Sequence, residues 1–191
     1  LNANGEYLKE VKIDSSSNEE PELYDGTLVK LGSQTISAAD TLSITIMDAS
    51  KLTNKQKISK ASLAPTDSLI DINVYRTISL ANTIFLDKEI TITLPYEDKD
   101  NDGYVDDTKV KEEGLNIYAY NQATGEWNKL FDTIVYPDEN LIEAKTNHLS
   151  LFALGGLAEA AVSGAEGSGG GRGGGCFIAT ACYGTDTAEE V

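Results

Sequence analysis

An alternating apolar run leads directly into an acidic cluster in the stretch Ile90-Thr-Ile-Thr-Leu-Pro-Tyr-Glu-Asp-Lys-Asp-Asn-Asp-Gly-Tyr-Val-Asp-Asp107. The isoleucines and leucine of its first part alternate with threonines, which is typical of a strand with one buried face. Its second part holds five aspartates within ten residues, from Asp98 to Asp107. A further strand-like run, Leu115 to Asn121, follows. The stretch therefore predicts an acidic loop between two strands.

The acidic cluster has the spacing of a calcium-binding loop. Positions 1, 3, 5 and 9 of such a loop are occupied by Asp98, Asp100, Asp102 and Asp106. Gly103 stands at position 6, where the backbone turns sharply, and Tyr104 at position 7 would contribute its carbonyl oxygen. A hard cation needs six or more converging oxygens, and without one these carboxylates repel one another. The sequence therefore predicts a Ca²⁺ site, with a solvated acidic turn as the alternative.

The loop departs from an EF-hand at two points. Position 12 carries Lys109 in place of a bidentate glutamate, and the flanking runs have the pattern of strands rather than helices. In its aspartate spacing the loop resembles the calcium loops of dockerins and thrombospondin type 3 repeats.

The composition limits the classes of partner. The chain of 191 residues has a formal net charge of −16, which argues against nucleic acid and anionic membranes as partners. It contains no apolar run long enough to span a bilayer, and no signal peptide is visible at Leu1. Because Leu1 takes the place of an initiating Met, we expect a processed or excised part of a longer protein.

Short alternating runs separated by turn signals predict an all-β fold, an antiparallel β-sandwich. The expected strands lie within residues 6–13, 27–31, 42–47, 68–76, 90–94, 115–121, 127–131, 134–136, 141–145 and 148–154. Residues 53–61 are expected to form a short helix or a loop. The predicted core consists of Ile44, Ile46, Ile70, Ile72, Val74, Ile92, Leu94, Ile117, Ala119, Trp127 and Phe152.

Composition also predicts the domain boundaries. Residues 1–23 are expected to form an N-terminal strand and linker, and residues 24–154 the β-sandwich domain. Residues 155–175 contain ten glycines among 21 positions, which predicts a disordered tether. Residues 176–191 form a separate, apolar C-terminal segment.

That C-terminal segment begins Cys176-Phe-Ile-Ala-Thr-Ala-Cys-Tyr-Gly184. This nonapeptide behind a glycine tract resembles the start of the CFI-box C-terminal domain of exported bacterial proteins, and the resemblance implies a sorting or anchoring role. The segment is truncated at Val191 relative to that family. The spacing of Cys176 and Cys182 does not fit a C-x-x-C zinc or redox site, and lipidation, a disulfide and plain burial stay open.

The central domain carries a second resemblance. Leu-Pro-Tyr96, the aspartate loop, Leu-Asn-Ile-Tyr-Ala-Tyr-Asn-Gln-Ala-Thr-Gly-Glu-Trp127 and Asn-His-Leu-Ser-Leu-Phe-Ala-Leu154 follow one another as in β-sandwich modules of bacterial surface proteins. The resemblance implies a non-enzymatic structural or adhesion module, extracellular or on the cell surface. A protein or glycan partner is expected there, and exposed edge strands could pair copies into a homo-oligomer.

The string His148-Leu149-Ser150 suggests a self-cleaving domain as an alternative. It is similar to the cleavage site of autoproteolytic GAIN domains, which implies an Ig-like or GAIN-like sandwich. By that resemblance His148 would deprotonate Ser150, whose hydroxyl attacks the Leu149 carbonyl, and water would hydrolyse the resulting ester. The cysteines that flank the site in GAIN domains are missing.

A third function, carbohydrate binding, is suggested by aromatic residues in the expected strands. Tyr118, Tyr120, Trp127 and Tyr136 could form an exposed aromatic face for stacking on sugars. At alternating spacing such residues also serve as ordinary strand residues, half in the core and half on the surface.

Overall fold

The computed structural model describes residues 6–61, 74–82 and 85–158 of the chain. These residues belong to a compact unit that spans Leu1–Ala160. The expected tether beyond Ala158, the CFI-box segment with Cys176 and Cys182, and the predicted core residues Ile70 and Ile72 lie outside the described residues.

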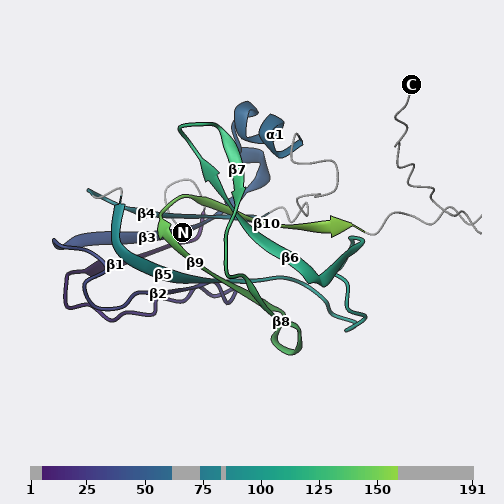
Figure 1. The fold of residues 1–191 in the computed structure, drawn as a ribbon, viewed down its shortest axis with the longest axis horizontal. Helices are drawn as coiled ribbons and strands as arrows, with labels where there is room; N and C mark the ends of the chain where they lie inside the picture. Colours follow the sequence, from purple (N-terminus) through teal and green to yellow (C-terminus); the bar gives the residue numbers. More distant parts are fainter. Residues whose placement is uncertain (1–5, 62–73, 83–84, 159–191) are drawn as a thin grey trace, which may run out of the picture. The chain divides into compact units, whose positions relative to one another are not determined.

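Two antiparallel sheets pack against each other, which confirms the prediction of an all-β sandwich (Figure 1). The six-stranded sheet has the order β1-β3-β4-β10-β6-β7, and the four-stranded sheet has the order β2-β5-β9-β8. The strands are β1 (Leu8–Ile13), β2 (Leu28–Lys30), β3 (Asp40–Asp48), β4 (Val74–Leu80), β5 (Phe85–Pro95), β6 (Val110–Asn121), β7 (Glu126–Lys129), β8 (Ile134–Tyr136), β9 (Leu141–His148) and β10 (Leu151–Ala158). The described helices are η1 (Ala49–Lys51), α1 (Asn54–Ala61) and η2 (Pro137–Glu139). None of them is long and apolar enough to cross a bilayer.

The main core lies between the two sheets and follows the alternation in the sequence. Ile90, Ile92 and Leu94 on β5 are at most 1% exposed, whereas the side chains between them face the other side of the sheet. Five of the predicted core residues are buried in this cluster: Ile44, Ile92, Leu94, Ile117 and Phe152. Ile46 and Ala119 are partly buried against it.

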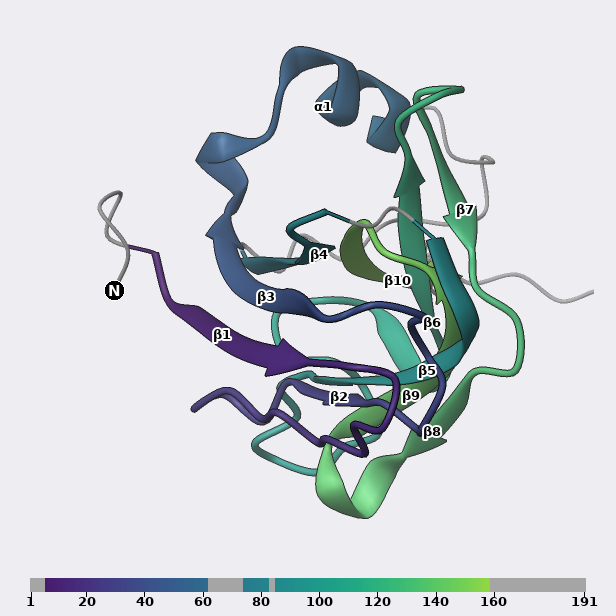
Figure 2. The same cartoon turned by 90° about the vertical axis from the view of Figure 1, so that its left-hand side faces the viewer.

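A second apolar cluster covers the outer face of the six-stranded sheet. Tyr75, Tyr118, Tyr120 and Trp127 are buried there with Leu52, Leu151 and Ala153. Helix α1 lies on this side, away from the four-stranded sheet (Figure 2), and the Trp127 indole Nε1–H donates to the Gln56 carbonyl at 3.2 Å. Trp127 is therefore a core residue, as predicted, but of this outer cluster rather than of the layer between the sheets.

Helix α1 begins with reciprocal hydrogen bonds between its capping residues. The Gln56 backbone N–H donates to Thr53 Oγ1 at 3.3 Å, and the Thr53 N–H donates to Gln56 Oε1 at 2.7 Å. This capping box satisfies amide groups that the first helical turn cannot pair. The expected short helix within residues 53–61 is thus present as α1.

The sandwich is longer at both ends than the predicted domain. Strand β1 pairs with β3 over its whole length, so the N-terminal strand belongs to the six-stranded sheet rather than to a separate linker. Strand β10 continues to Ala158, past the predicted boundary at Leu154. Gly155 and Gly156 were assigned to the tether from composition, but both are buried and pair with β6. A Cβ at Gly156 would lie 2.4 Å from Val110 Cγ1 and 2.9 Å from the Gly114 carbonyl oxygen.

This close approach makes Gly156 a sensitive position. Gly156→Ala should lower the free energy of unfolding by about 1–3 kcal/mol, because the added methyl group must displace the β6 backbone or Val110. Urea denaturation measures the change, and Gly32→Ala is the matched control because a Cβ there meets nothing within 4 Å. Equal stability of the two variants would show that Gly156 is not packed in the sheet.

Candidate metal centre

The acidic loop carries the chain from β5 in the four-stranded sheet to β6 in the six-stranded sheet (Figure 1). Backbone hydrogen bonds close it at its base: the Asp106 N–H donates to the Glu97 carbonyl at 2.7 Å, and the Glu112 N–H donates to the Gly103 carbonyl at 3.1 Å. The loop is therefore a closed structure at a junction between the two sheets.

The tight curvature of the loop depends on residues that tolerate a left-handed backbone. Gly103 has φ +83°, and Asn101 and Asp107 have φ values of 53° and 61°. Glycine adopts this conformation without steric cost, and Asn and Asp do so more readily than other residues. Gly103 thus fills the role that the sequence predicted for position 6.

Three of the four predicted aspartates come together. Asp98, Asp100 and Asp106 each offer a carboxylate oxygen, and these oxygens all lie within 4.8 Å of one another. Asp98 is buried at 2% exposure, Asp106 is half-buried and Asp100 is exposed. Asp102 lies outside this set, since its Oδ1 accepts a hydrogen bond from the Tyr104 N–H at 2.9 Å.

The buried Asp98 carboxylate is held by amide groups of its own loop. Its two oxygens accept from the Asp102 N–H at 3.3 Å and the Gly103 N–H at 3.1 Å. The Asn140 side chain, from the loop before β9, donates to the Asp98 carbonyl at 3.2 Å. The two backbone N–H groups orient the carboxylate and offset part of the cost of burying it, whereas Asn140 holds the Asp98 backbone.

The remaining charges of the loop oppose one another. The pKa of Asp100 is raised above its ordinary value. The main cause is the negative charge of Asp102, and the second is the side-chain hydrogen bond with Asp98. Lys99 Nζ lies 2.6 Å from Glu97 Oε2 and 3.6 Å from Asp106 Oδ2, but its side chain is exposed. Solvent screens such pairs, so Lys99 offsets little of the repulsion among the aspartates.

Tyr104, the fifth predicted ligand, faces the start of β6. It forms an antiparallel bridge with Lys111, flanked by hydrogen bonds from the Val105 N–H to the Val110 carbonyl and from the Glu112 N–H to the Gly103 carbonyl. In a pair of this kind the carbonyl groups of the two facing residues point away from the partner strand. The three converging carboxylates are hard donors, so the cluster can hold a hard metal ion.

A buried group beneath the loop did not stand out in the sequence. Tyr96, Glu112 and Asn140 each have a buried side-chain oxygen without a hydrogen-bond partner among the described residues. The sequence could have indicated the burial of Glu112 through the alternation of β6, which places Glu112 on the same inward face as Val110.

The self-cleavage candidates occupy a crossover rather than a continuous strand. Strand β9 ends at His148 and β10 begins at Leu151, so Leu149 and Ser150 carry the chain between sheets and the strand predicted over residues 148–154 is interrupted. Ser150 Oγ donates a hydrogen bond to the Tyr120 carbonyl. A carbonyl oxygen cannot serve as the general base that activation of the hydroxyl requires.

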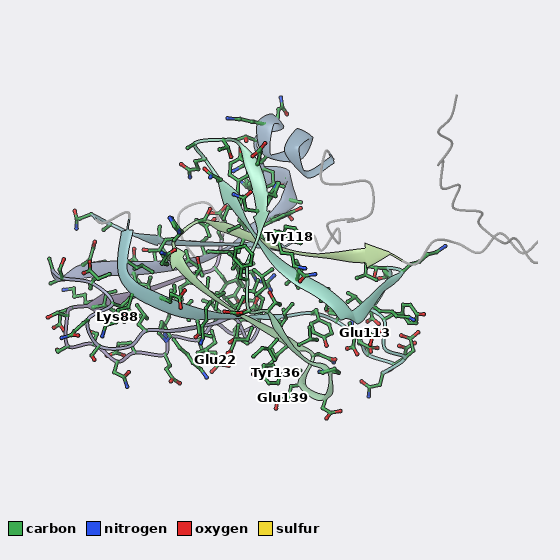
Figure 3. The ribbon with its side chains drawn as sticks, viewed as in Figure 1. Glu22, Lys88, Glu113, Tyr118, Tyr136 and Glu139 are labelled. Atoms are coloured by element: carbon green, nitrogen blue, oxygen red, sulfur yellow. The ribbon has the colours of Figure 1, made fainter. Side chains whose placement is uncertain are left out.

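The expected aromatic face is not formed. Tyr118, Tyr120 and Trp127 are at most 6% exposed because the outer cluster and α1 cover them. Tyr136 is 39% exposed but lies on β8 of the other sheet, apart from Tyr118 (Figure 3). These four residues therefore provide no common surface for stacking on sugars.

No family model matches the chain. The curated proteins contain no match to it either.

Asp100→Asn should change stability in opposite directions with and without calcium. In EDTA at pH 7 the variant should melt at a higher temperature than the parent, because the neutral amide removes repulsion from Asp102 and Asp98. In millimolar calcium it should melt at a lower temperature, because an ion ligand is lost. Thermal denaturation followed by circular dichroism measures both.

Asp87→Asn is the control for this test, since Asp87 is an exposed carboxylate on β5 outside the loop. The difference between its melting temperature and that of the parent should be the same in EDTA and in calcium. A lower melting temperature of Asp100→Asn in EDTA would show that the loop carboxylates do not oppose one another.

Ser150→Ala should lower the free energy of unfolding by about 1 kcal/mol, because the Tyr120 carbonyl loses its donor. Ser79→Ala, at an exposed position of β4, is the control.

On a denaturing gel the parent and Ser150→Ala should both run as one band near 20.5 kDa. Two fragments in the parent that vanish in the variant would establish cleavage at Leu149–Ser150.

Proposed function

We propose that this chain is a non-enzymatic structural or adhesion module of an exported bacterial cell-surface protein, stiffened by Ca²⁺ bound at Asp98, Asp100 and Asp106. The observation that carries the proposal is the convergence of these three carboxylates in a closed loop between the two sheets. An ion bound there would hold β5 and β6 in a fixed relation and so couple the sheets.

Calcium suits a short, carboxylate-rich loop better than magnesium does. Ca²⁺ takes about six to eight oxygen ligands in a flexible geometry, whereas Mg²⁺ demands a near-ideal octahedron and gives up its water reluctantly. The loop offers three carboxylates whose oxygens lie within 4.8 Å of one another, and the Tyr104 carbonyl is a further candidate ligand.

An exterior location fits both the ion and the charge. Calcium is abundant outside cells, where it would be bound continuously and would stabilise the folded state by mass action. The formal net charge of −16 also attracts divalent cations to the protein.

Partners at the surface are supported by apolar side chains near the edges of the sheets. Strand β1 is an edge of the six-stranded sheet, and Tyr7 and Leu8 at its start are 46% and 37% exposed. Strand β8 is an edge of the four-stranded sheet, and Ile134 and Tyr136 on it are 50% and 39% exposed. An edge strand with free main-chain groups can pair with another chain, so we assign homo-oligomer or partner contacts to these edges.

The cation claim is tested by titrating the EDTA-treated chain with calcium in a calorimeter. We expect one Ca²⁺ to bind per chain and Mg²⁺ to bind much more weakly. When the free calcium concentration is 100 times the Kd, the free energy of unfolding should rise by about 2.7 kcal/mol, which corresponds to a rise of about 5–10 °C in Tm. Asp98→Asn and Asp106→Asn should each abolish the rise, whereas Asp87→Asn should keep it. A melting curve of the intact protein that EDTA and calcium leave unchanged would reject the proposal.

A further inference from the structure

Glu112 on β6 is a buried carboxylate without a cationic partner. Its side chain is 7% exposed, and Oε1 is buried without a hydrogen-bond partner. Glu112 forms no ion pair among the described residues, whereas Arg76 pairs with Asp25 and Lys99 with Glu97 and Asp106. A buried charge that lacks a partner costs several kcal/mol, so a carboxylate at this position requires compensation.

Glu112 lies directly against the aspartate loop. Its backbone N–H donates to the Gly103 carbonyl at 3.1 Å, and the Gly103 N–H in turn donates to Asp98 Oδ2 at 3.1 Å. One residue, Gly103, therefore joins the backbone of Glu112 to the buried ligand of the cluster.

Tyr96 lies near the same two carboxylates. Its hydroxyl oxygen is buried and has no hydrogen-bond partner. The pKa of this hydroxyl is raised above its ordinary value, by burial first and then by the neighbouring carboxylates of Glu112 and Asp98. Tyr96 therefore lies within reach of the charges of both Glu112 and Asp98.

Asn140 contacts the loop from the side of β9. Its Nδ2 donates to the Asp98 carbonyl, while its Oδ1 is buried and has no hydrogen-bond partner. With Tyr96 and Glu112 it completes a set of three buried oxygens whose hydrogen-bonding capacity is unused. Such a group lowers stability unless a water molecule or an ion satisfies it.

We propose that Glu112 is the inner carboxylate of the cation site and replaces the acidic residue that the loop lacks at Lys109. The proposal rests on calcium binding at the aspartate cluster. Glu112 is not among the residues whose oxygens converge within 4.8 Å, so it acts through a water molecule that bridges its carboxylate to the ion. Tyr96 and Asn140 are positioning residues that hold this carboxylate and water in place.

The same arrangement explains how the loop works without a ligand at position 12. The bridge between Tyr104 and Lys111 folds the start of β6 back along the loop. This fold brings Glu112, three residues after Lys109, against Gly103, whose N–H donates to Asp98. In an EF-hand a helix performs the same task by carrying the position-12 glutamate back to the ion.

Glu112→Gln tests the proposal because it keeps the shape of the side chain and removes its charge. The variant should raise the calcium Kd by about 10–100-fold, as loss of outer-shell metal partners does. In EDTA its Tm should equal or exceed that of the parent, because an unpaired buried charge is gone. The matched control is Glu113→Gln, an exposed neighbour on the same strand (Figure 3), which should bind calcium like the parent.

Tyr96→Phe is the second variant, for use if Glu112→Gln does not fold. Like Glu112→Gln, it should raise the calcium Kd, and it leaves the loop aspartates intact. If the parent binds calcium and Glu112→Gln or Tyr96→Phe binds it as tightly as Glu113→Gln does, Glu112 is not part of the site. A parent that binds no calcium would instead contradict the proposed function itself.

Discussion

Mutual repulsion among aspartate carboxylates is the constraint on which the centre of this structure depends. Asp98, Asp100 and Asp106 converge where the chain passes from one sheet to the other. Backbone N–H groups directed at Asp98 offset part of the repulsion, whereas the exposed Lys99 offsets little of it. Three residues with a left-handed backbone set the curvature of the loop. A divalent cation would convert this unfavourable cluster into a joint between the sheets.

Apolar packing and a largely buried ion pair also hold the two sheets together. Arg76 on β4 of the six-stranded sheet reaches Asp25, before β2 of the four-stranded sheet, at 2.8 Å. Arg76 also donates to Thr27, which is fully buried. The two polar junctions, at Arg76 and at the aspartate loop, differ in kind: the first is complete within the protein, and the second gathers negative charge that the described residues do not balance.

Local rules predicted much of this fold. Alternation identified most strands, and the calcium-loop spacing identified Asp98, Asp100 and Asp106, which converge, because both patterns act over a few residues. Features that depend on distant packing were missed. Tyr118, Tyr120 and Trp127 pack in the outer cluster instead of forming an exposed face. Gly156 is needed because Val110 leaves no room for a side chain there, and Asp102 accepts from the Tyr104 N–H and lies outside the cluster. Glu112 and Asn140 reach the site only through strand pairing.

A crystal structure of the intact chain grown in calcium tests the central claim most directly. The account predicts an ion with anomalous signal among Asp98, Asp100 and Asp106, with oxygen ligands at about 2.3–2.6 Å. Aspartate side chains that diverge into solvent at saturating calcium, with no ion between them, would contradict it.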